Sequence, residues 1–451
     1  MKIAVIGTGY VGLVSGACFA ELGHDVICVD KDAAKIDALK KGHIPIYEPD
    51  LEKTVKENVS RRRLSFTTEI KDAVSQAEII FLAVGTPTNP KNGSADLSWI
   101  YAAAKELGPL LPKNAVVVTK STVPVGTARR IRAKIYKARG QRDVFIASNP
   151  EFLREGCAVK DFMEPDRILV GVGSAHAEEQ LRRVYLPLTS HGVPLIVTDT
   201  DTSELTKYAA NGFLATKIAY INEMADICER AGADVEVLAQ GMGLDPRIGR
   251  TYLRPGPGFG GSCFPKDTLA LDYISKKLGE PSALVQAVIV SNDRRKIQMA
   301  KKIIAAAGGS VKKKTVAILG LTFKANTDDM RESASLVIVP ALLKAGANLR
   351  LYDPEGRKQA KKLMHLPKNT EVKWCASLKE CITGADATVI VTEWNEFASL
   401  DPAQFCKLTD APLLIDLRNL FERKRMEDAG IEYHSIGRAP VFGKKKALKR
   451  V

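Results

Sequence analysis

The stretch Lys2–Asp30, KIAVIGTGYVGLVSGACFAELGHDVICVD, decides the fold of the amino-terminal part of the chain. A short apolar run suited to a buried parallel strand leads directly into glycines at 7, 9 and 12, in the spacing G-x-G-x-x-G. A predicted helix then stops at Gly23, and a second strand ends in Asp30, 18 positions after Gly12. This order is the dinucleotide fingerprint, in which the helix N-terminus holds pyrophosphate and the acid binds the ribose hydroxyls. An acid there disfavours a 2′-phosphate and favours NAD over NADP, although Lys31 beside it leaves NADP open.

A second informative stretch, Arg254–Asp267 (RPGPGFGGSCFPKD), places Cys263 in a loop rich in proline and glycine. Such a sequence builds neither a helix nor a central strand. We therefore expect an unshielded thiol, with Lys266 and Asp267 close to it in sequence. Oxidation of an aldehyde to an acid needs such a nucleophile, because hydride leaves more readily from a tetrahedral adduct than from a free aldehyde. A surface loop with an incidental thiol is the alternative.

Composition limits the kind of protein that this chain can form. Its 451 residues, 45% hydrophobic and 26% charged, predict a globular protein of two or three domains. No apolar run is long enough to cross a bilayer, so we expect no membrane partner. None of the eight cysteines forms a C-x-x-C pair and the six histidines are scattered, so we expect no metal site. A thiol-dependent active site implies a reducing compartment, and therefore a cytoplasmic location.

The net charge of +14 could indicate binding to nucleic acid. The chain lacks the interleaved aromatic and basic residues that single-strand binders use. Much of the excess lies in three runs, Arg61–Arg63, Lys312–Lys314 and the tail from Lys444 to Arg450, and such runs are usually solvated faces or frayed ends. We expect no nucleic-acid partner.

The first unit leads into a long helix. Predicted strands end in polar residues at Thr86, at Ser121-Thr122 and at Asn149-Pro150-Glu151, and in a doubly wound sheet such strand ends face the ligand. A helical run follows from about Asp201 to Arg230 and would be about 45 Å long, which suits a helix that joins two domains or forms a dimer core. Asp201 and Glu204 form a candidate capping box for this helix.

A second nucleotide-binding-like unit begins near Lys312. The segments Thr315–Gly320, Asn348–Asp353 and Asp386–Thr392 echo the strands of the first unit. The glycine fingerprint is replaced by GLTFK, residues 320–324, so we expect this unit to bind something other than NAD. Lys324 and Arg331 suit phosphate, and a merely structural α/β domain is the alternative.

Seven segments together resemble those of the UDP-glucose 6-dehydrogenases, within the wider family of nucleotide-sugar dehydrogenases. They are GTGYVG, KSTVPVGT, NPEFLREG, ELTKYAANGFLATKIAYINE, DPRIGR, FGGSCFPKD and FKANTDDMRES, and the resemblance runs from Met1 to about Arg438. It implies an α/β fold of two Rossmann-like doubly wound domains joined by a long central helix, in a homodimer. We place an NAD-binding domain at 1–200, a central helical dimerisation region with the cysteine loop at 201–300, and a UDP-sugar-binding domain at 301–451, with the tail after about 438 disordered.

By that resemblance, the chain oxidises UDP-glucose to UDP-glucuronate and passes two hydrides to two NAD molecules. Cys263 adds to the intermediate aldehyde as a thiohemiacetal, and the second hydride transfer leaves a thioester that water hydrolyses. The resemblance implies that Lys207 and Asn211, four residues apart on one helical face, stabilise oxyanions. It implies that Asp267 acts with a water as base, and that Thr122 and Glu151 hold and activate that water.

The resemblance also implies the ligand contacts. The predicted cofactor contacts are Gly7, Gly9, Val11, Gly12, Asp30, Lys35, Thr86, Thr122, Glu155, Lys266 and Arg331. The predicted substrate contacts are Glu151, Phe152, Leu153, Lys207, Asn211, Tyr252, Gly256, Gly260 and Lys324, with Arg247 reaching the site of the neighbouring subunit.

Three alternatives stay open. Another nucleotide-sugar dehydrogenase, acting on GDP-mannose or a UDP-N-acetyl sugar, would use the same thiol chemistry, although DPRIGR and KYAANGFLATKIAYINE lean towards UDP-glucose. A simple hydroxyacid dehydrogenase of similar fold would transfer one hydride and need no thiol. A non-catalytic protein would sense NAD or use its basic surface on RNA, with the strong salt dependence of such binding.

Overall fold

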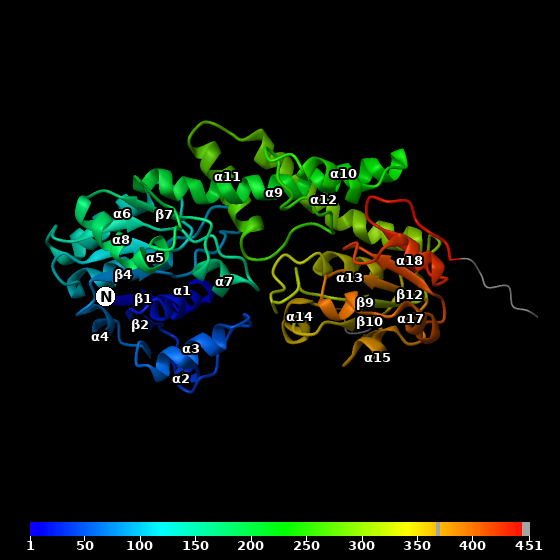
Figure 1. The fold of residues 1–451 in the computed structure, drawn as a ribbon, viewed down its shortest axis with the longest axis horizontal. Helices are drawn as coiled ribbons and strands as arrows, with labels where there is room; N and C mark the ends of the chain where they lie inside the picture. The colour runs from blue at the N-terminus through cyan, green and yellow to red at the C-terminus, as the bar shows by residue number, and fades with distance from the viewer. Residues whose placement is uncertain (367–369, 444–451) are drawn as a thin grey trace, which may run out of the picture. The chain divides into compact units, whose positions relative to one another are not determined.

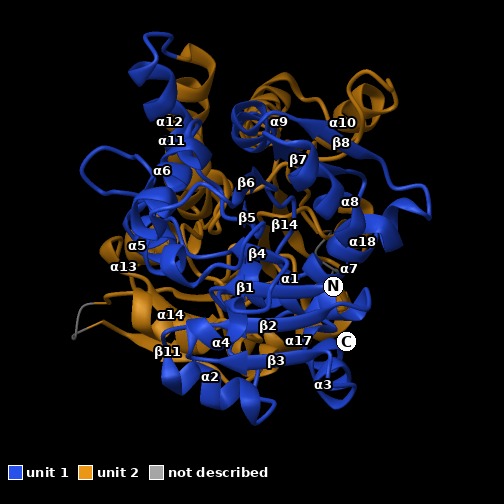
Figure 2. Ribbon diagram, turned by 90° about the vertical axis from the view of Figure 1, so that its left-hand side faces the viewer, with its two compact units in different colours: residues 1–210, 269–281 blue, residues 211–268, 282–451 orange. Residues whose placement is uncertain are grey.

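The computed structural model describes residues 1–366 and 370–443 of the chain. The chain divides into two compact units. Unit 1 comprises Met1–Ala210 and Leu269–Pro281, and unit 2 comprises Asn211–Thr268 and the chain from Ser282 onward (Figure 2). Each unit contains one β-sheet with helices around it. In the described part of the chain, no helix combines the length and the apolar character that a membrane span requires.

Unit 1, which includes the blue amino-terminal part of the ribbon in Figure 1, has an eight-stranded sheet. Its strands lie in the order β3-β2-β1-β4-β5-β6-β7-β8, as the labels in Figure 2 show. Its strands are β1 (Lys2–Ile6), β2 (Asp25–Val29), β3 (Leu64–Thr67), β4 (Ile79–Leu82), β5 (Val116–Thr119), β6 (Phe145–Ser148), β7 (Ile168–Val172) and β8 (Leu195–Thr198). Neighbouring strands are parallel except β6 and β7. Every residue of β4 and β5 is buried, which is why both are uninterrupted apolar runs in the sequence. The first six strands have the order 3-2-1-4-5-6, so the predicted doubly wound fold is confirmed.

Two apolar cores cover the two faces of this sheet. Ile3 and Val5 of β1 pack into one core with α1, and Ala4 and Ile6 pack into the other with α5 and α6. The helices of unit 1 are α1 (Tyr10–Glu21), α2 (Ala33–Lys40), α3 (Leu51–Ser60), α4 (Ile70–Val74), α5 (Ser98–Leu107), α6 (Thr127–Arg139), α7 (Ala158–Met163) and α8 (Ala175–Thr189).

Helix α1 packs very closely on the sheet. A Cβ atom on Gly12 would lie 1.9 Å from the carbonyl oxygen of Gly7, and one on Gly16 would lie 2.3 Å from Sγ of Cys28. Only glycine fits at these positions, and Gly12 is the third glycine of the fingerprint, which requires this close packing of helix and strand. Cys18 and Cys28 are fully buried in the core, as predicted.

Unit 2 has a six-stranded parallel sheet in the order β11-β10-β9-β12-β13-β14. Its strands are β9 (Thr315–Leu319), β10 (Asn348–Tyr352), β11 (Val372–Trp374), β12 (Ala387–Ile390), β13 (Leu413–Asp416) and β14 (Glu432–Ser435). Its helices are α10 (Val235–Gly243), α12 (Ala283–Ala306), α13 (Ser335–Lys344), α14 (Arg357–Leu363), α15 (Leu378–Ile382), α16 (Asn395–Ala398), α17 (Pro402–Leu408) and α18 (Arg423–Asp428).

The prediction that the second unit repeats the architecture of the first is confirmed, and the two units share an equivalent hydrogen bond. In unit 1 the backbone N–H of Thr8 donates to Oδ2 of Asp30 at 2.9 Å. In unit 2 the backbone N–H of Thr322 donates to Oδ2 of Asp353 at 3.1 Å. In each case a threonine after the first strand binds the aspartate that follows the second strand.

Two helices run through the boundary between the units, α9 (Thr200–Ala231) and α11 (Phe264–Lys277). Helix α9 stops where predicted, at Gly232, whose φ is +72°. The predicted capping box is wrong. Asp199 accepts the N–H of Thr202 at 2.8 Å, whereas Glu204 accepts N–H groups at the start of α6, from Gly126, Thr127 and Ala128. A buried carboxylate at a helix N-terminus satisfies more donors there than it could at the solvated start of α9.

The predicted domain boundaries at 200 and 300 stay a prediction. The predicted disorder after about Arg438 falls mainly on residues 444–451, which lie outside the described residues. Before them, Val441 exchanges two backbone hydrogen bonds of 2.9 and 3.0 Å with Tyr433.

Candidate active site

The loop that carries Cys263 is packed, not exposed. Residues 255–257 and 259–261 are buried, and Cys263 itself is half-buried, so the thiol that was expected to be unshielded is partly shielded. A Cβ atom on Gly260 would lie 2.5 Å from the carbonyl oxygen of Glu332, and one on Gly261 would lie 2.7 Å from the ring of Phe323. The glycines therefore serve close packing against residues 323–332 of unit 2.

Cys263 immediately precedes α11, and its carbonyl oxygen accepts the N–H of Asp267 at 2.8 Å. The Oγ of Ser262 lies 3.6 Å from its Sγ. The start of a helix favours negative charge, because its N–H groups point outward and the helix dipole is positive there. This position therefore suits a cysteine that must react as a thiolate.

Asp267 is a buried carboxylate held from two sides. Only 1% of the residue is exposed, its Oδ2 accepts a hydrogen bond of 2.6 Å from Nδ2 of Asn211, and Lys266 forms an ion pair with Oδ1. Cys263, Lys266, Asp267 and Asn211 all belong to unit 2, so the structure brings together these four predicted site residues.

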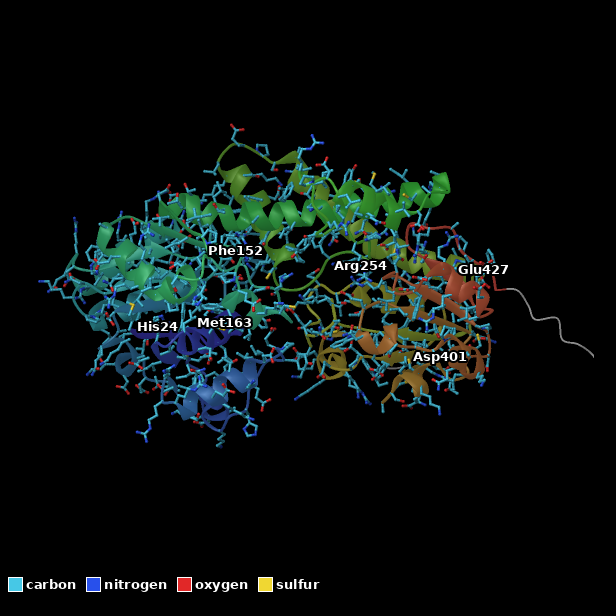
Figure 3. The ribbon with its side chains drawn as sticks, viewed as in Figure 1. His24, Phe152, Met163, Arg254, Asp401 and Glu427 are labelled. Atoms are coloured by element: carbon cyan, nitrogen blue, oxygen red, sulfur yellow. The ribbon has the colours of Figure 1, made fainter. Side chains whose placement is uncertain are left out.

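A second cluster lies in unit 1, at the carboxyl end of β6. Nζ of Lys207 lies 3.2 Å from Oε1 of Glu151, and both side chains are at least 95% buried. The other carboxylate oxygen accepts the N–H of Leu153 at 2.6 Å. The ring of Phe152, labelled in Figure 3, lies 5.3 Å from Nζ of Lys207. The structure therefore brings together the predicted residues Glu151, Phe152, Leu153 and Lys207.

Lys120 extends this second cluster and was not predicted. It follows β5 directly, is buried, and donates to Oδ1 of Asn149 at 3.0 Å and to the hydroxyl of Tyr185 at 3.4 Å. Burial lowers the pKa of Lys120 to about 8, and the charges of Glu151 and Lys207 act on it in opposite directions. A charged residue that continues the apolar run VVVT was the available signal in the sequence.

The glycine-rich loop of unit 1 has the features of a dinucleotide site. Helix α1 begins after Gly9 without a side-chain cap, and no atom lies within 4 Å of a Cβ atom built on Gly9. The N-terminus of α1 thus has donors and space for a pyrophosphate. Asp30 accepts hydrogen bonds from Thr8 and from Nζ of Lys35, the latter at 2.9 Å. Burial alone would raise its pKa, but these bonds lower the pKa of Asp30 to about 2.

Two further predicted cofactor contacts lie in loops that are tied together. Oγ1 of Thr86, after β4, donates to the carbonyl oxygen of Thr122, after β5, at 2.9 Å. Glu155 is buried. Next to it, Gly156 and Ala158 donate their N–H groups to the carboxylate of Glu48 at 2.6 Å, which fixes the loop before α7.

The remaining predicted contacts are spread over unit 2. Tyr252 has a φ of +65°, an uncommon conformation for a bulky residue and one that occurs at functional sites. Arg331 forms an ion pair of 2.7 Å with Asp329, and its carbonyl oxygen accepts the N–H of Gly261 at 2.7 Å. Nζ of Lys324 lies 5.5 Å from the ring centre of Phe323.

Arg247 does not join the cysteine cluster. Its side chain is 87% exposed and forms an ion pair with Asp245 at 2.6 Å. The predicted contact of Arg247 with a neighbouring subunit stays a prediction.

Sequence comparisons find one protein family along nearly the whole chain. Three profiles of the UDP-glucose/GDP-mannose dehydrogenase family match it: the NAD binding domain over residues 1–189, the central domain over 201–294 and the UDP binding domain over 317–423. The chain belongs to the UDP-glucose/GDP-mannose dehydrogenase family.

Individual members of the family are similar over their full length. A UDP-glucose 6-dehydrogenase of Rhizobium meliloti is 52% identical over 97% of this chain and 100% of its own length. A UDP-glucose 6-dehydrogenase of Bacillus subtilis is 46% identical over 98% of this chain and 94% of its own length. The solved structure of a UDP-glucose dehydrogenase from Pyrobaculum islandicum has a TM-score of 0.88 at 36% identity, over 97% of this chain and 98% of that one.

Membership of the UDP-glucose/GDP-mannose dehydrogenase family confirms the predicted enzyme class and cofactor domain. The glycine loop and Asp30 lie in the part that matches the NAD binding domain, and Lys324 and Arg331 lie in the part that matches the UDP binding domain. The alternative of a merely structural second unit is therefore wrong. The second unit lacks the glycine fingerprint and matches the UDP binding domain of the family, not its NAD binding domain, as the sequence indicated.

Proposed function

We propose that this chain oxidises UDP-glucose to UDP-glucuronate and reduces two NAD molecules for each sugar. The observation that carries the proposal is Cys263 at the start of α11, beside the buried Asp267–Asn211 pair, in a chain 52% identical to a UDP-glucose 6-dehydrogenase. In the balanced reaction, one alcohol, two NAD⁺ and one water give a carboxylate, two NADH and three protons. The glycine loop of unit 1 would hold NAD, which would supply the hydride acceptor.

Cys263 supplies the covalent step. Its sulfur adds to the aldehyde carbon, and the carbonyl electron pair becomes an oxyanion that takes up a proton. Loss of hydride from this thiohemiacetal leaves a thioester, and water then adds and releases the thiol. Lys207 and Asn211 occupy positions one turn apart on α9 and would stabilise the oxyanions. Asp267 would accept protons, and Thr122 and Glu151 would orient the water.

Replacement of the cysteine tests this assignment. We expect Cys263→Ala to abolish glucuronate formation while the affinity for NAD and for UDP-glucose stays within about threefold, because the thiol acts after binding. Cys157→Ala is the matched control, because Cys157 is exposed and lies outside the cysteine loop. An undiminished rate of glucuronate formation in Cys263→Ala would remove Cys263 from the mechanism.

The choice of nucleotide sugar is a separate question. UDP-glucose is favoured by both relatives named above and by the Pyrobaculum islandicum structure. The rival substrates are GDP-mannose and a UDP-N-acetyl sugar. We expect kcat/KM for UDP-glucose to exceed those for both rivals by at least about 100-fold, a ratio that one good pocket can supply. A higher value for either rival would contradict this choice.

The number of hydrides distinguishes this proposal from a simple hydroxyacid dehydrogenase. We expect two NADH for each UDP-glucose consumed, measured by absorbance after complete conversion. A yield of one NADH would favour the single-hydride reaction.

We also propose that the chain acts as a homodimer through α9 and α12. Three large apolar side chains recur every seven residues on α9 and stay exposed, Phe213 at 65%, Tyr220 at 47% and Ile227 at 55%. On α12, Val290 and Ile297 repeat the same spacing at 66% and 53%. An exposed apolar stripe of this kind marks an interaction surface. Arg247 would reach the partner's site, and the reactive thiol suits the reducing cytoplasm.

A further inference from the structure

Asn292 holds one residue of the cysteine loop from both sides. The backbone N–H of Phe259 donates to Oδ1 of Asn292 at 2.8 Å, and Nδ2 of Asn292 donates to the carbonyl oxygen of Phe259 at 3.0 Å. Asn292 lies on α12 and is only 5% exposed. Gly258 is part of the arrangement, because a Cβ atom there would lie 3.0 Å from Oδ1 of Asn292. A side chain at residue 258 would therefore crowd the carboxamide.

Gly256 is held in the same way by two other side chains. Its N–H donates to Oδ1 of Asn222, on α9, at 2.8 Å. Its carbonyl oxygen accepts a hydrogen bond of 3.0 Å from Nε of Arg295, on α12. Asn222 and Arg295 are both buried. Two residues of the loop therefore have both backbone polar groups bound by buried side chains from two long helices.

The sequence of the loop explains why side chains are needed. Pro255 and Pro257 have no N–H to donate, and the residues around them are buried. A buried backbone N–H or C=O without a partner costs about as much as a lost hydrogen bond. The segment forms neither a helix nor a strand, so it lacks the regular backbone partners of those elements. Gly261 donates to a backbone carbonyl oxygen, that of Arg331, whereas Gly256 and Phe259 bind side chains. The carboxamide of Asn292 matches one residue's N–H and C=O together, and it does so four residues before Cys263.

We propose that Asn292 is a positioning residue for the nucleophile, and that Asn222 and Arg295 support it. The inference depends on the proposed function, in which Cys263 adds to an aldehyde. In that step a displacement of about 1 Å can reduce the rate about 100-fold, because the reacting atoms must approach in a narrow range of geometry. Asn292 contacts the loop at residue 259, so its loss displaces the sulfur without removing any group that reacts.

The first test measures the thiol directly and does not need the sugar reaction. Iodoacetamide labelling of Cys263, followed by peptide mass spectrometry, reports how the loop presents the sulfur in the full-length protein. We expect Asn292→Ala to change the labelling rate at least fivefold. Asn58→Ala is the matched control, because Asn58 is a buried, hydrogen-bonded asparagine on α3, in the other unit. We expect Asn58→Ala to lower the melting temperature and leave the labelling rate unchanged.

The second test measures how the intermediate aldehyde divides between capture by Cys263 and release. In the wild type the aldehyde is captured by Cys263 and two NADH form for each sugar. In Asn292→Ala we expect kcat to fall about 10- to 100-fold with KM for NAD within threefold. We also expect NADH per sugar to fall below two, with the released aldehyde trapped as an oxime by hydroxylamine. A merely structural role would lower the melting temperature and leave the stoichiometry at two.

A second substitution of Asn292 keeps the proposal testable if Asn292→Ala fails to fold. Asn292→Asp keeps the acceptor for the N–H of Phe259 but places a second acceptor against its carbonyl oxygen, so we expect the same labelling and stoichiometry defects as in Asn292→Ala. Wild-type labelling rate, kcat and stoichiometry in both variants would overturn the proposal. If the wild type itself yields one NADH, the proposed function fails, and the labelling experiment still decides the role of Asn292.

Discussion

Asp267 accepts a hydrogen bond of 2.6 Å from Asn211, and this bond orients its buried carboxylate. Lys266 binds the second oxygen of the same carboxylate. Groups with this support do not reorganise when charge moves during a reaction, which is the condition for efficient proton transfer and electrostatic stabilisation.

Asp267→Asn should retain the fold and lose the proton acceptor. We expect kcat to fall by about 10²- to 10⁴-fold, the usual contribution of a general base, with KM for UDP-glucose within about threefold. Steady-state kinetics with purified protein measure both constants. Asp272→Asn is the matched control, since Asp272 lies five residues further along α11 and forms an ion pair with Lys276. A kcat within threefold of the wild type in Asp267→Asn would exclude the role.

The buried charge of Lys120 should lower the stability of the native state while it supports activity. Burial lowers its pKa to about 8 from the ordinary value of 10.5, so the ammonium form destabilises the native state. The shift corresponds to about 3 kcal/mol. Lys120→Met keeps the length of the side chain without the charge, and Tyr185 still donates to Asn149. We expect Lys120→Met to raise the free energy of unfolding at pH 7 by about 1 to 3 kcal/mol and to lower kcat, because the charge next to Glu151 and Lys207 is lost.

The pH dependence checks this sign. Between about pH 8 and 10.5 the unfolded chain binds more protons at Lys120 than the native chain, so the stability of the wild type relative to Lys120→Met should rise with pH in this range. Urea titrations at several pH values measure the difference. Lys113→Met, at an exposed lysine before the same strand, should show no such slope. A wild type more stable than Lys120→Met at pH 7 would contradict the prediction.

We expect Asp30 to determine the choice between NAD and NADP. It is ionised above a pKa of about 2 and would repel the 2′-phosphate of NADP. We expect Asp30→Asn to lower kcat/KM for NAD about tenfold and to raise the ratio of NADP to NAD turnover at least tenfold, as expected when a ribose-binding acid is lost. Asp25→Asn, at the other end of β2, is the control and should leave the ratio unchanged. An unchanged ratio in Asp30→Asn would assign the discrimination to other groups.

Local sequence order was sufficient to predict much of the fold. The strand, glycines, helix and acid of residues 2–30 are contiguous, so periodicity and spacing describe them completely. The second unit was predictable for the same reason, because Asp353 repeats the relationship of Asp30 to its loop.

Contacts between distant segments could not be predicted in this way. Glu204 has the spacing of a capping box with Asp201, yet it binds residues 126–128, and no local pattern indicates that choice. The contacts of Lys120 and Asn292 could not be predicted for the same reason. Each acts through partners at least 29 positions away, and a single sequence contains no record of such pairs.

The apolar stripe on α9 gives the last prediction. Phe213 is 65% exposed, and the opposite face of α9 carries Asn222, which binds the cysteine loop at Gly256. A dimer formed through this stripe would therefore fix the helix that holds the loop. We expect Phe213→Glu to dissociate the dimer, because a charge in an apolar interface is costly to bury. At low protein concentration we expect this variant to lower the rate of iodoacetamide labelling of Cys263, or kcat, by at least tenfold. Leu186→Glu, at a 60% exposed leucine on α8, is the control and should remain dimeric and active. Sedimentation velocity and kinetics measured at the same concentrations decide the matter: a monomeric Phe213→Glu with wild-type kcat would separate assembly from the cysteine loop, and a dimeric Phe213→Glu would place the interface elsewhere.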